Sequence, residues 1–370
     1  MIRQVKRNEF KQIINFANQI FFESGEKDFL ELQPKVYNHP DEYYSCHYVD
    51  EHMNKIVGLI GTYPLKYQSL KLLGVGTVCV DPKYRNQGIM KKMLTYLDTN
   101  IAPNYDLLYL SGNKKRYENF GYYKSGQKIS FQIKQCTFKN NDFETYKIIS
   151  YQNNDEEINQ QLYEMYIWNK NRVIERAIFN FYDSLRTLSY EIYLIFEDNL
   201  KGYLVYERKN NVIKEIVSKD DDLDNILYSF TNYLNLPEIH YEVAMDDENI
   251  PLLYDICNNY HISNLNNLKV INYVNVIETL LRNKKKLKKG RLSIKIIDKI
   301  TLMIDVDNQI AVTSTANDTV ADIIVSEKEF HSLLFDDVNH FYFGTRDKYD
   351  LISNYFPLVL PITITSIDSF

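Results

Sequence analysis

The sequence predicts an α/β fold followed by an α+β unit, arranged as three domains at residues 1–135, 136–284 and 285–370. A chain of 370 residues is longer than one ordinary domain. Strand-like and helix-like apolar patterns alternate through the first two domains, whereas the third places short strands before helices. Polar or charged stretches at residues 139–142 and 282–291 interrupt these patterns and mark the boundaries.

The first domain opens with a short strand at residues 2–5 and a helix for which Asn8 is the candidate N-cap. The apolar residues of this helix fall on one side: Phe10, Ile13, Ile14, Ala17, Ile20 and Phe21. Strands at residues 43–49 and 56–65 follow, joined by a polar turn. A further strand leads into a loop and a second helix, and residues 107–110 form another strand.

Residues 78–94, VCVDPKYRNQGIMKKML, are the most informative segment. An apolar strand runs into an Asp-Pro turn, and an amphipathic helix follows Gly88. The first N–H groups of a helix have no partners within it, and the helix dipole favours negative charge there. Gly88 leaves room for a phosphate and Arg85 adds positive charge. The segment predicts an anion-binding site, although a plain strand–helix crossover with a surface arginine shows the same short pattern.

The second domain repeats the alternating order, but its sequence contains no second R-x-x-G loop. Its predicted helices lie near residues 158–166 and 223–234. Its predicted strands are residues 192–196, 202–206, 212–216, 240–243 and 268–273. The predicted strands of the third domain are residues 294–297, 302–306, 310–313 and 321–325. Ser326 and Glu329 form a capping box that opens a helix, and a short helix follows near residues 349–355.

Composition restricts the class of protein. A net charge of −6 argues against a general nucleic-acid binder, and no apolar run approaches the roughly 18 residues that cross a bilayer. The four cysteines and seven histidines show no metal-ligand spacing, so we expect reduced thiols and no metal site. The first residues lack the apolar stretch of a signal peptide, and a cytoplasmic protein is therefore expected. The lysine-rich run at residues 282–291 is interpreted as a helix end and a linker.

Two local patterns resemble the GNAT acetyltransferase superfamily. The loop with Arg85 and Gly88 is similar to its signature Q/R-x-x-G-x-G/A at a strand-to-helix turn, although Met90 stands where the superfamily prefers Gly or Ala. Ser111, followed by the run Tyr117-x-x-Phe-Gly-Tyr, resembles the segment after the strand that splays away from the motif strand. The resemblance implies an N-acetyltransferase that uses acetyl-CoA as its cosubstrate.

The three-part arrangement resembles the enhanced intracellular survival (Eis) family over essentially the whole chain. The run V-C-V-D-P-x-Y-R-N-Q-G-I-M is similar to the family's cofactor loop, and L-K-V-I-N at residues 268–272 to its passage into the third domain. The resemblance implies a catalytic GNAT domain at residues 1–135, a degenerate GNAT-like domain at 136–284 and a sterol-carrier-protein-like domain at 285–370. It also implies a homohexamer that acetylates polyamine, lysine or aminoglycoside amines by direct attack on the thioester.

The same resemblance assigns roles to individual residues. Tyr117 would protonate the departing thiolate, because a phenol with a reference pKa of about 10 stays protonated. The α-carboxylate of Phe370 would be the base, anchored by its apolar side chain. The residues that would bind acetyl-CoA are Val78, Cys79, Val80, Arg85, Asn86, Gln87, Gly88, Ile89, Met90, Ser111 and Gly112. Phe21, Phe22 and Glu23 would border the substrate pocket.

Each assignment has an alternative. Tyr117 could be an ordinary core tyrosine, Phe370 could belong to a frayed terminus, and Glu23 could be solvated. The chain could be a catalytically silent GNAT-fold binding or regulatory protein, although its loop and Tyr117 are those of an active enzyme. It could also be a lipid carrier through its third domain, where charged residues would interrupt an apolar tunnel. A peptidyl acyltransferase that uses aminoacyl-tRNA would need a larger basic surface.

Overall fold

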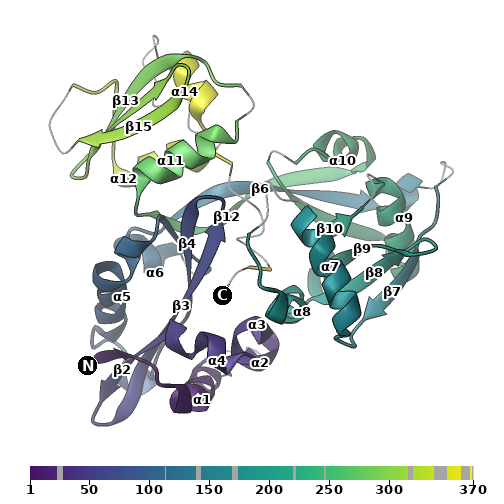
Figure 1. Cartoon of the computed structure of the whole chain (residues 1–370), viewed down its shortest axis with the longest axis horizontal. Helices are drawn as coiled ribbons and strands as arrows, with labels where there is room; N and C mark the ends of the chain where they lie inside the picture. The colour runs from purple at the N-terminus through teal and green to yellow at the C-terminus, as the bar shows by residue number, and fades with distance from the viewer. Residues whose placement is uncertain are drawn as a thin grey trace.

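The computed structural model describes residues 1–370 except 23–27, 113, 139–142, 169–173, 220–221, 246, 285, 316–319, 337–347, 360–366 and 369. Within the described residues, the strands form one sheet of 12 strands and a second sheet of 4. The large sheet runs from the purple strands to the teal strands and includes one light-green strand, and the small green sheet lies above its purple part (Figure 1). The expected mixed α/β content is confirmed.

The N-terminal part of the large sheet is antiparallel from β1 to β4, and β4 then pairs in parallel with β5. Its strands are β1 (Ile2–Gln4), β2 (His47–His52), β3 (Lys55–Tyr67), β4 (Leu70–Val80) and β5 (Leu107–Leu110). Its helices are α1 (Phe10–Phe22), α2 (Phe29–Leu32), α3 (Pro34–Tyr37), α4 (Pro40–Tyr43), α5 (Ile89–Asn100) and α6 (Lys114–Tyr117). The helices α1 and α5 cover opposite faces, because Leu59 and Tyr63 of β3 pack with α1 whereas Ile60 packs with α5.

The predicted strand at residues 43–49 is wrong in its first half. Pro40 occupies the first position of α4, where proline favours a helical turn, and a short 3-10 turn at Tyr44–Cys46 follows. The strand β2 therefore begins only at His47. The predicted strands at residues 56–65 and 107–110 are confirmed, since they lie within β3 and β5.

The middle of the chain continues the same sheet in the order β12-β6-β11-β10-β9-β8-β7. Its strands are β6 (Tyr123–Lys134), β7 (Lys147–Tyr151), β8 (Glu191–Phe196), β9 (Leu200–Glu207), β10 (Val212–Ser218), β11 (Glu238–Ala244) and β12 (Asn259–Val270). Its helices are α7 (Glu156–Trp168), α8 (Phe181–Leu185), α9 (Leu223–Leu234) and α10 (Ile250–Ile256). The strand β12 pairs with β5 and with β6, so the sheet runs without a break from residues of the first predicted domain to those of the second.

The last part of the chain forms the small sheet, in the order β15-β14-β13-β16. Its elements are α11 (Tyr273–Arg282), β13 (Gly290–Ile296), β14 (Thr301–Val306), β15 (Ile310–Thr315), β16 (Ile323–Val325), α12 (Glu327–Phe335) and α14 (Tyr349–Tyr355). The predicted capping box is confirmed: Ser326 Oγ accepts from the N–H of Glu329, and the Glu329 carboxylate accepts from the N–H of Ser326.

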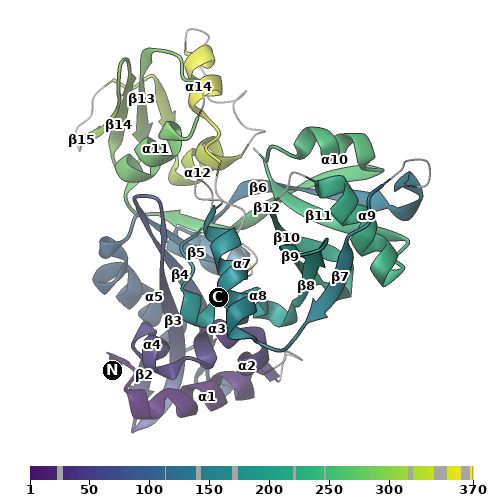
Figure 2. The ribbon, with the colours of Figure 1, turned by 45° about the vertical axis from the view of Figure 1, so that its right-hand side comes forward.

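The chain end returns from this last part to the large sheet. The chain end, marked C, lies near α3, between the N-terminal part and the middle of the chain, in both views (Figure 1, Figure 2). Lys35 of α3 contacts both Ile367 and Phe370. No helix in the described part of the chain is long and apolar enough to cross a membrane.

Candidate active site

The strand β4 leaves β5 partway along its length. The parallel pairing joins Leu72–Gly74 of β4 to Leu107–Tyr109 of β5, while β4 continues to Val80 alongside β3. At its other edge β5 pairs with β12. No described strand pairs with β4 on the β5 side beyond Gly74. The backbone groups of this stretch can therefore pair with an extended ligand.

A β-bulge lies in the same stretch of β4. The register with β3 shifts beside Thr77, which has a φ of 50°. A bulge leaves an extra residue outside the ladder and changes the direction of the strand. The Thr77 hydroxyl lies 2.8 Å from the Tyr37 hydroxyl, which ties the bulge to α3. The bulge thus shapes the backbone next to Val78, where the sequence predicts contact with the cofactor.

The loop between β4 and α5 is open to solvent. Asn86 and Gly88 have positive φ values of 63° and 77°, and Gly88 is the N-cap of α5. A Cβ at position 88 would meet nothing within 4 Å, so the space beside the first turn of α5 is free. The exposed Arg85 donates from Nε to the Val80 carbonyl at 3.4 Å. Free N–H groups at a helix start and an adjacent guanidinium suit a pyrophosphate.

The remaining predicted cofactor residues follow one path. Those on the end of β4, across the loop and into α5 are Val78, Cys79, Val80, Gln87, Ile89 and Met90. Ser111 and Gly112 follow β5 directly and are exposed. The structure therefore brings both predicted segments to the diverging ends of β4 and β5.

Tyr117 is buried at the end of α6. Its ring packs edge-on against Tyr122, with 6.3 Å between centroids. A Cβ at Gly112 would lie 2.8 Å from the Tyr117 ring, so the ring occupies space that glycine leaves free. Burial raises the pKa of Tyr117, and smaller effects come from Arg116, which lowers it, and Cys79 of β4, which raises it. The phenol therefore keeps its proton at neutral pH and lies near the motif strand.

Phe370 lies against β4 from the opposite face. Its ring stacks on Tyr63 with 4.2 Å between centroids and an 18° angle between planes. Lys35 Nζ lies 3.9 Å from the centroid of the same ring. A Cβ at Gly76 would come within 2.5 Å of the Phe370 carboxyl carbon, so the end of the chain approaches the β4 backbone where glycine permits it. Phe370 packs with the α1 side of the sheet, whereas Tyr117 packs with the α5 side.

A buried polar cluster supports the ring on which Phe370 stacks. His47 Nδ1 lies 2.8 Å from the Tyr43 carbonyl and donates to it, so Nε2 accepts from the Tyr63 hydroxyl at 3.0 Å. Burial lowers the pKa of His47 to about 4, which keeps the imidazole neutral. This cluster could not be predicted from the sequence, because His47 and Tyr63 lie 16 residues apart and the members form no recognisable pattern.

We expect the free energy of unfolding to fall as the pH decreases from about 6.5 to about 4. Burial lowers the pKa of His47 from 6.5 to about 4, and that of His331 to about 3. Between these values the unfolded chain takes up protons that the folded chain does not, so stability rises with pH in this window. Urea unfolding at a series of pH values measures the slope. A His331→Leu variant should flatten it, and a slope unchanged in that variant would contradict the explanation.

Of the residues predicted to border the substrate pocket, only Phe21 has a described side chain. It is half-buried near the end of α1 and packs edge-on against Phe29 of α2, with 5.0 Å between centroids. The Phe22 side chain and Glu23 lie outside the described residues.

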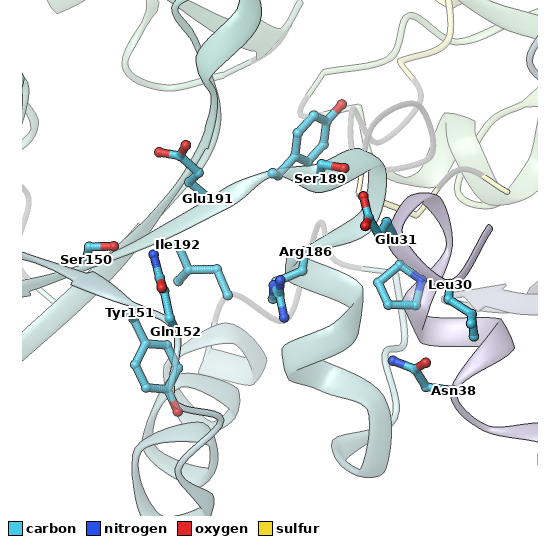
Figure 3. A pocket seen from close by; sticks show the side chains of 12 residues that line it. Leu30, Glu31, Asn38, Ser150, Tyr151, Gln152, Arg186, Ser189, Glu191 and Ile192 are labelled. Carbon is cyan, nitrogen blue, oxygen red and sulfur yellow. The ribbon is translucent and has the colours of Figure 1, made fainter. Parts of the chain in front are cut away.

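A separate pocket of about 510 Å³ opens between the α2–α3 region and the edge of β7 and β8 (Figure 3). Glu31 and Asn38 line one side, and Arg186 lies between them and Gln152 on the other (Figure 3). No predicted site residue that the structure describes lines this pocket. Nor do the described side chains gather three or more His, Cys, Asp or Glu into a group that could hold a metal ion. The candidate site is therefore the divergence of β4 and β5.

Residues 43–124 match the family model described as an acetyltransferase (GNAT) domain. This range contains β4, the loop, α5 and Tyr117, so the candidate site lies on a GNAT acetyltransferase domain. No curated protein matches the sequence significantly.

Several solved structures share the fold along the whole chain. A probable N-acyltransferase of unknown function from Enterococcus faecalis V583 has a TM-score of 0.70 at 15% identity, covering 98% of each chain. A GCN5-related N-acetyltransferase from Anabaena variabilis ATCC 29413 has a TM-score of 0.68 at 15% identity, covering 96% of each chain. Eis1 from Mycobacterium abscessus has a TM-score of 0.68 at 14% identity, covering 100% of each chain. The family model confirms the predicted GNAT acetyltransferase domain, and the predicted resemblance to Eis proteins is confirmed as a likeness in fold along the whole chain.

Proposed function

We propose that the protein is an acetyl-CoA-dependent N-acetyltransferase that acts on primary amines by direct attack on the thioester. The observation that carries the proposal is the meeting of three features at the divergence of β4 and β5. These are the open start of α5, the buried phenol of Tyr117 on one face and the carboxyl group of Phe370 on the other. A GNAT acetyltransferase domain over residues 43–124 supports the reaction class.

Acetyl-CoA would lie along the path of predicted cofactor residues. Its pyrophosphate would accept hydrogen bonds from the N–H groups of residues 85–90, next to the Arg85 guanidinium. Its pantetheine arm would pair like an added strand with the edge of β4 near Val78 and Val80, along which no described strand pairs. The acetyl group would then reach the bulge beside Thr77, close to Tyr117 and Phe370.

The chemistry requires one base and one acid. The amine nitrogen attacks the acetyl carbonyl carbon, a C–N bond forms, and the C–S bond to coenzyme A breaks. The Phe370 carboxylate, directly or through a water, would take the proton that the amine loses. Its reference pKa of about 3.5 is low for a base, and the half-buried position against Gly76 would raise its basicity. Tyr117 would give its proton to the thiolate, since burial keeps the phenol protonated until that step.

The class of amine that would accept the acetyl group follows from the proposed reaction and from the resemblance to the Eis family. We propose primary amines of polyamine or lysine type, and aminoglycosides as a further group. The direct test is coenzyme A release, detected with a thiol reagent, from acetyl-CoA and a panel of these amines, with acetylated product confirmed by mass spectrometry. Acetyl-CoA binding by calorimetry without turnover on any amine would instead support a binding or regulatory protein.

We also propose the tandem arrangement that the resemblance implies. Residues 1–135 would form the catalytic GNAT domain, residues 136–284 a degenerate GNAT-like domain, and residues 285–370 a sterol-carrier-protein-like domain. The whole-chain likeness in fold to Eis1 from Mycobacterium abscessus supports this division. By the same resemblance the protein would be a homohexamer. Multi-angle light scattering at micromolar concentration should report six copies, and a monomer would contradict the proposed assembly.

We expect Gly88→Glu to weaken acetyl-CoA binding about tenfold or more. Gly88 has a positive φ of 77°, which a side chain disfavours, and a carboxylate there would repel the phosphates. Calorimetry measures the affinity. Asn100→Glu is a matched control, because it adds the same charge at the exposed far end of the same helix. Normal binding in Gly88→Glu would show that the pyrophosphate lies elsewhere.

A further inference from the structure

The chain end is held by more than the stacking of Phe370 on Tyr63. Ile367 and Asp368, which lie three and two residues before Phe370, are 0% and 3% exposed. Lys35 Nζ of α3 donates to the Ile367 carbonyl at 2.7 Å. The Tyr109 hydroxyl of β5 donates to the Asp368 carbonyl at 2.9 Å. Two elements of the N-terminal part therefore bind the backbone of this segment.

The carboxylate of Asp368 is bound by the middle of the chain. Arg176, whose side chain is 2% exposed, donates to it from Nε at 2.9 Å and from Nη2 at 3.1 Å. The same guanidinium donates twice to Glu215 of β10, at 2.9 Å each. The Tyr203 hydroxyl adds a bond of 2.7 Å to Glu215, and the Tyr166 ring lies 4.2 Å from the guanidinium carbon. Every charge in this buried group is paired and hydrogen-bonded.

The charges in the group are complementary to the chain end. Without Asp368, the Nε donor of Arg176 would lose its acceptor, and the Lys35 amine would lose the negative charge that favours its protonated form. Burial lowers the pKa of Lys35 to about 7, and Asp368 acts in the opposite direction by favouring the protonated amine. Since a buried charge without a partner is costly, the site favours an acidic segment over an uncharged one.

We propose that Lys35, Tyr109, Arg176 and Glu215 form a binding site for the chain's own Ile367–Asp368 segment, and that this tail site fixes the position of the Phe370 carboxyl group. Phe370 follows Asp368 by two residues, which span at most about 7 Å. Fixing Asp368 therefore confines the terminal carboxyl group to a small region beside Gly76. Arg176 and Glu215 act as positioning residues, and the middle of the chain contributes them to a site whose other residues lie in the N-terminal part.

Buried ion pairs of this kind add little net stability, because desolvation offsets the attraction between the charges. Their main effect is on orientation, since a guanidinium that donates two hydrogen bonds to a carboxylate binds it in few orientations. An apolar contact would hold the segment less specifically. The arrangement therefore suits a site that fixes the position of the C-terminal segment.

The tail site is tested in the full-length protein with Asp368→Asn, which keeps the shape of the side chain and leaves Arg176 paired with Glu215. Carboxypeptidase A removes an accessible C-terminal phenylalanine, and mass spectrometry follows the loss of Phe370. We expect release about tenfold faster or more in Asp368→Asn than in the unaltered protein. Tyr109→Phe, which removes one bond to the tail, should accelerate release by a smaller factor. Asp41→Asn, which breaks the exposed pair with Arg7, is the control and should leave release unchanged.

A kinetic measurement then connects the tail site with catalysis, and this part rests on the proposed function. Asp368→Asn should lower kcat while leaving the KM for acetyl-CoA within about twofold. Equal protection of Phe370 in the unaltered protein, Asp368→Asn and Tyr109→Phe would overturn the tail site, whatever the activity. An inactive unaltered protein with a protected tail would overturn the proposed function and leave the tail site standing.

Discussion

A protein extended by a few residues after Phe370 should lose turnover by roughly 10²–10⁴-fold, the usual contribution of a positioned proton acceptor. The extension converts the carboxylate into an amide, which cannot take the proton of the amine. Every internal side chain remains unchanged.

Steady-state turnover on the best amine measures this effect. The control carries the same residues before Met1, which is 85% exposed, and should keep full turnover. Intact mass of the unextended protein verifies that its chain ends at Phe370. Unchanged turnover in the extended protein would place the base elsewhere, with Glu23 the next candidate.

Tyr117→Phe should lower turnover by roughly 10²–10⁴-fold through loss of the proton donor to the thiolate. The substitution removes one hydroxyl and leaves the ring that packs on Tyr122. Affinity for acetyl-CoA and thermal stability should therefore change little. Lowering the pH should not restore the turnover of Tyr117→Phe, because the variant lacks the hydroxyl that donates the proton.

Tyr122→Phe is the matched control for this prediction. Tyr122 is fully buried beside Tyr117, and the described residues give its hydroxyl no hydrogen-bond partner. Removal of the Tyr122 hydroxyl should leave turnover nearly unchanged. Equal losses in Tyr117→Phe and Tyr122→Phe would indicate a packing role for both rings and would contradict a specific acid.

The parts of the fold that sequence analysis predicted well have strong local signals. The helix predicted at residues 223–234 coincides with α9, whose apolar face is periodic and whose end is marked by Asn235 in a left-handed conformation. In contrast, the strand β12 begins at Asn259, well before the predicted start at residue 268. The stretch before residue 268 contains four asparagines, which have low strand propensity, and pairing with β6 overrides that propensity.

The residues of the candidate site also fall into those that could be predicted from the sequence and those that could not. The loop from Arg85 to Gly88 could be predicted because strand, turn and helix are consecutive in the sequence. The tail site could not, since Lys35 lies 332 residues from Ile367 and Arg176 lies 192 residues from Asp368. Only the folded chain brings a lysine of α3 and an arginine of the middle part to the same carboxyl-terminal segment.

The most direct test of the central claim is a crystal structure of the full-length protein with acetyl-CoA. We expect one molecule of acetyl-CoA per chain, with its pyrophosphate on the N–H groups of residues 85–90 and its pantetheine arm along β4. The thioester should lie between the Tyr117 hydroxyl and the Phe370 carboxylate. A pyrophosphate bound anywhere else, or a thioester out of reach of Tyr117 and Phe370, would contradict the proposed acetyltransferase site.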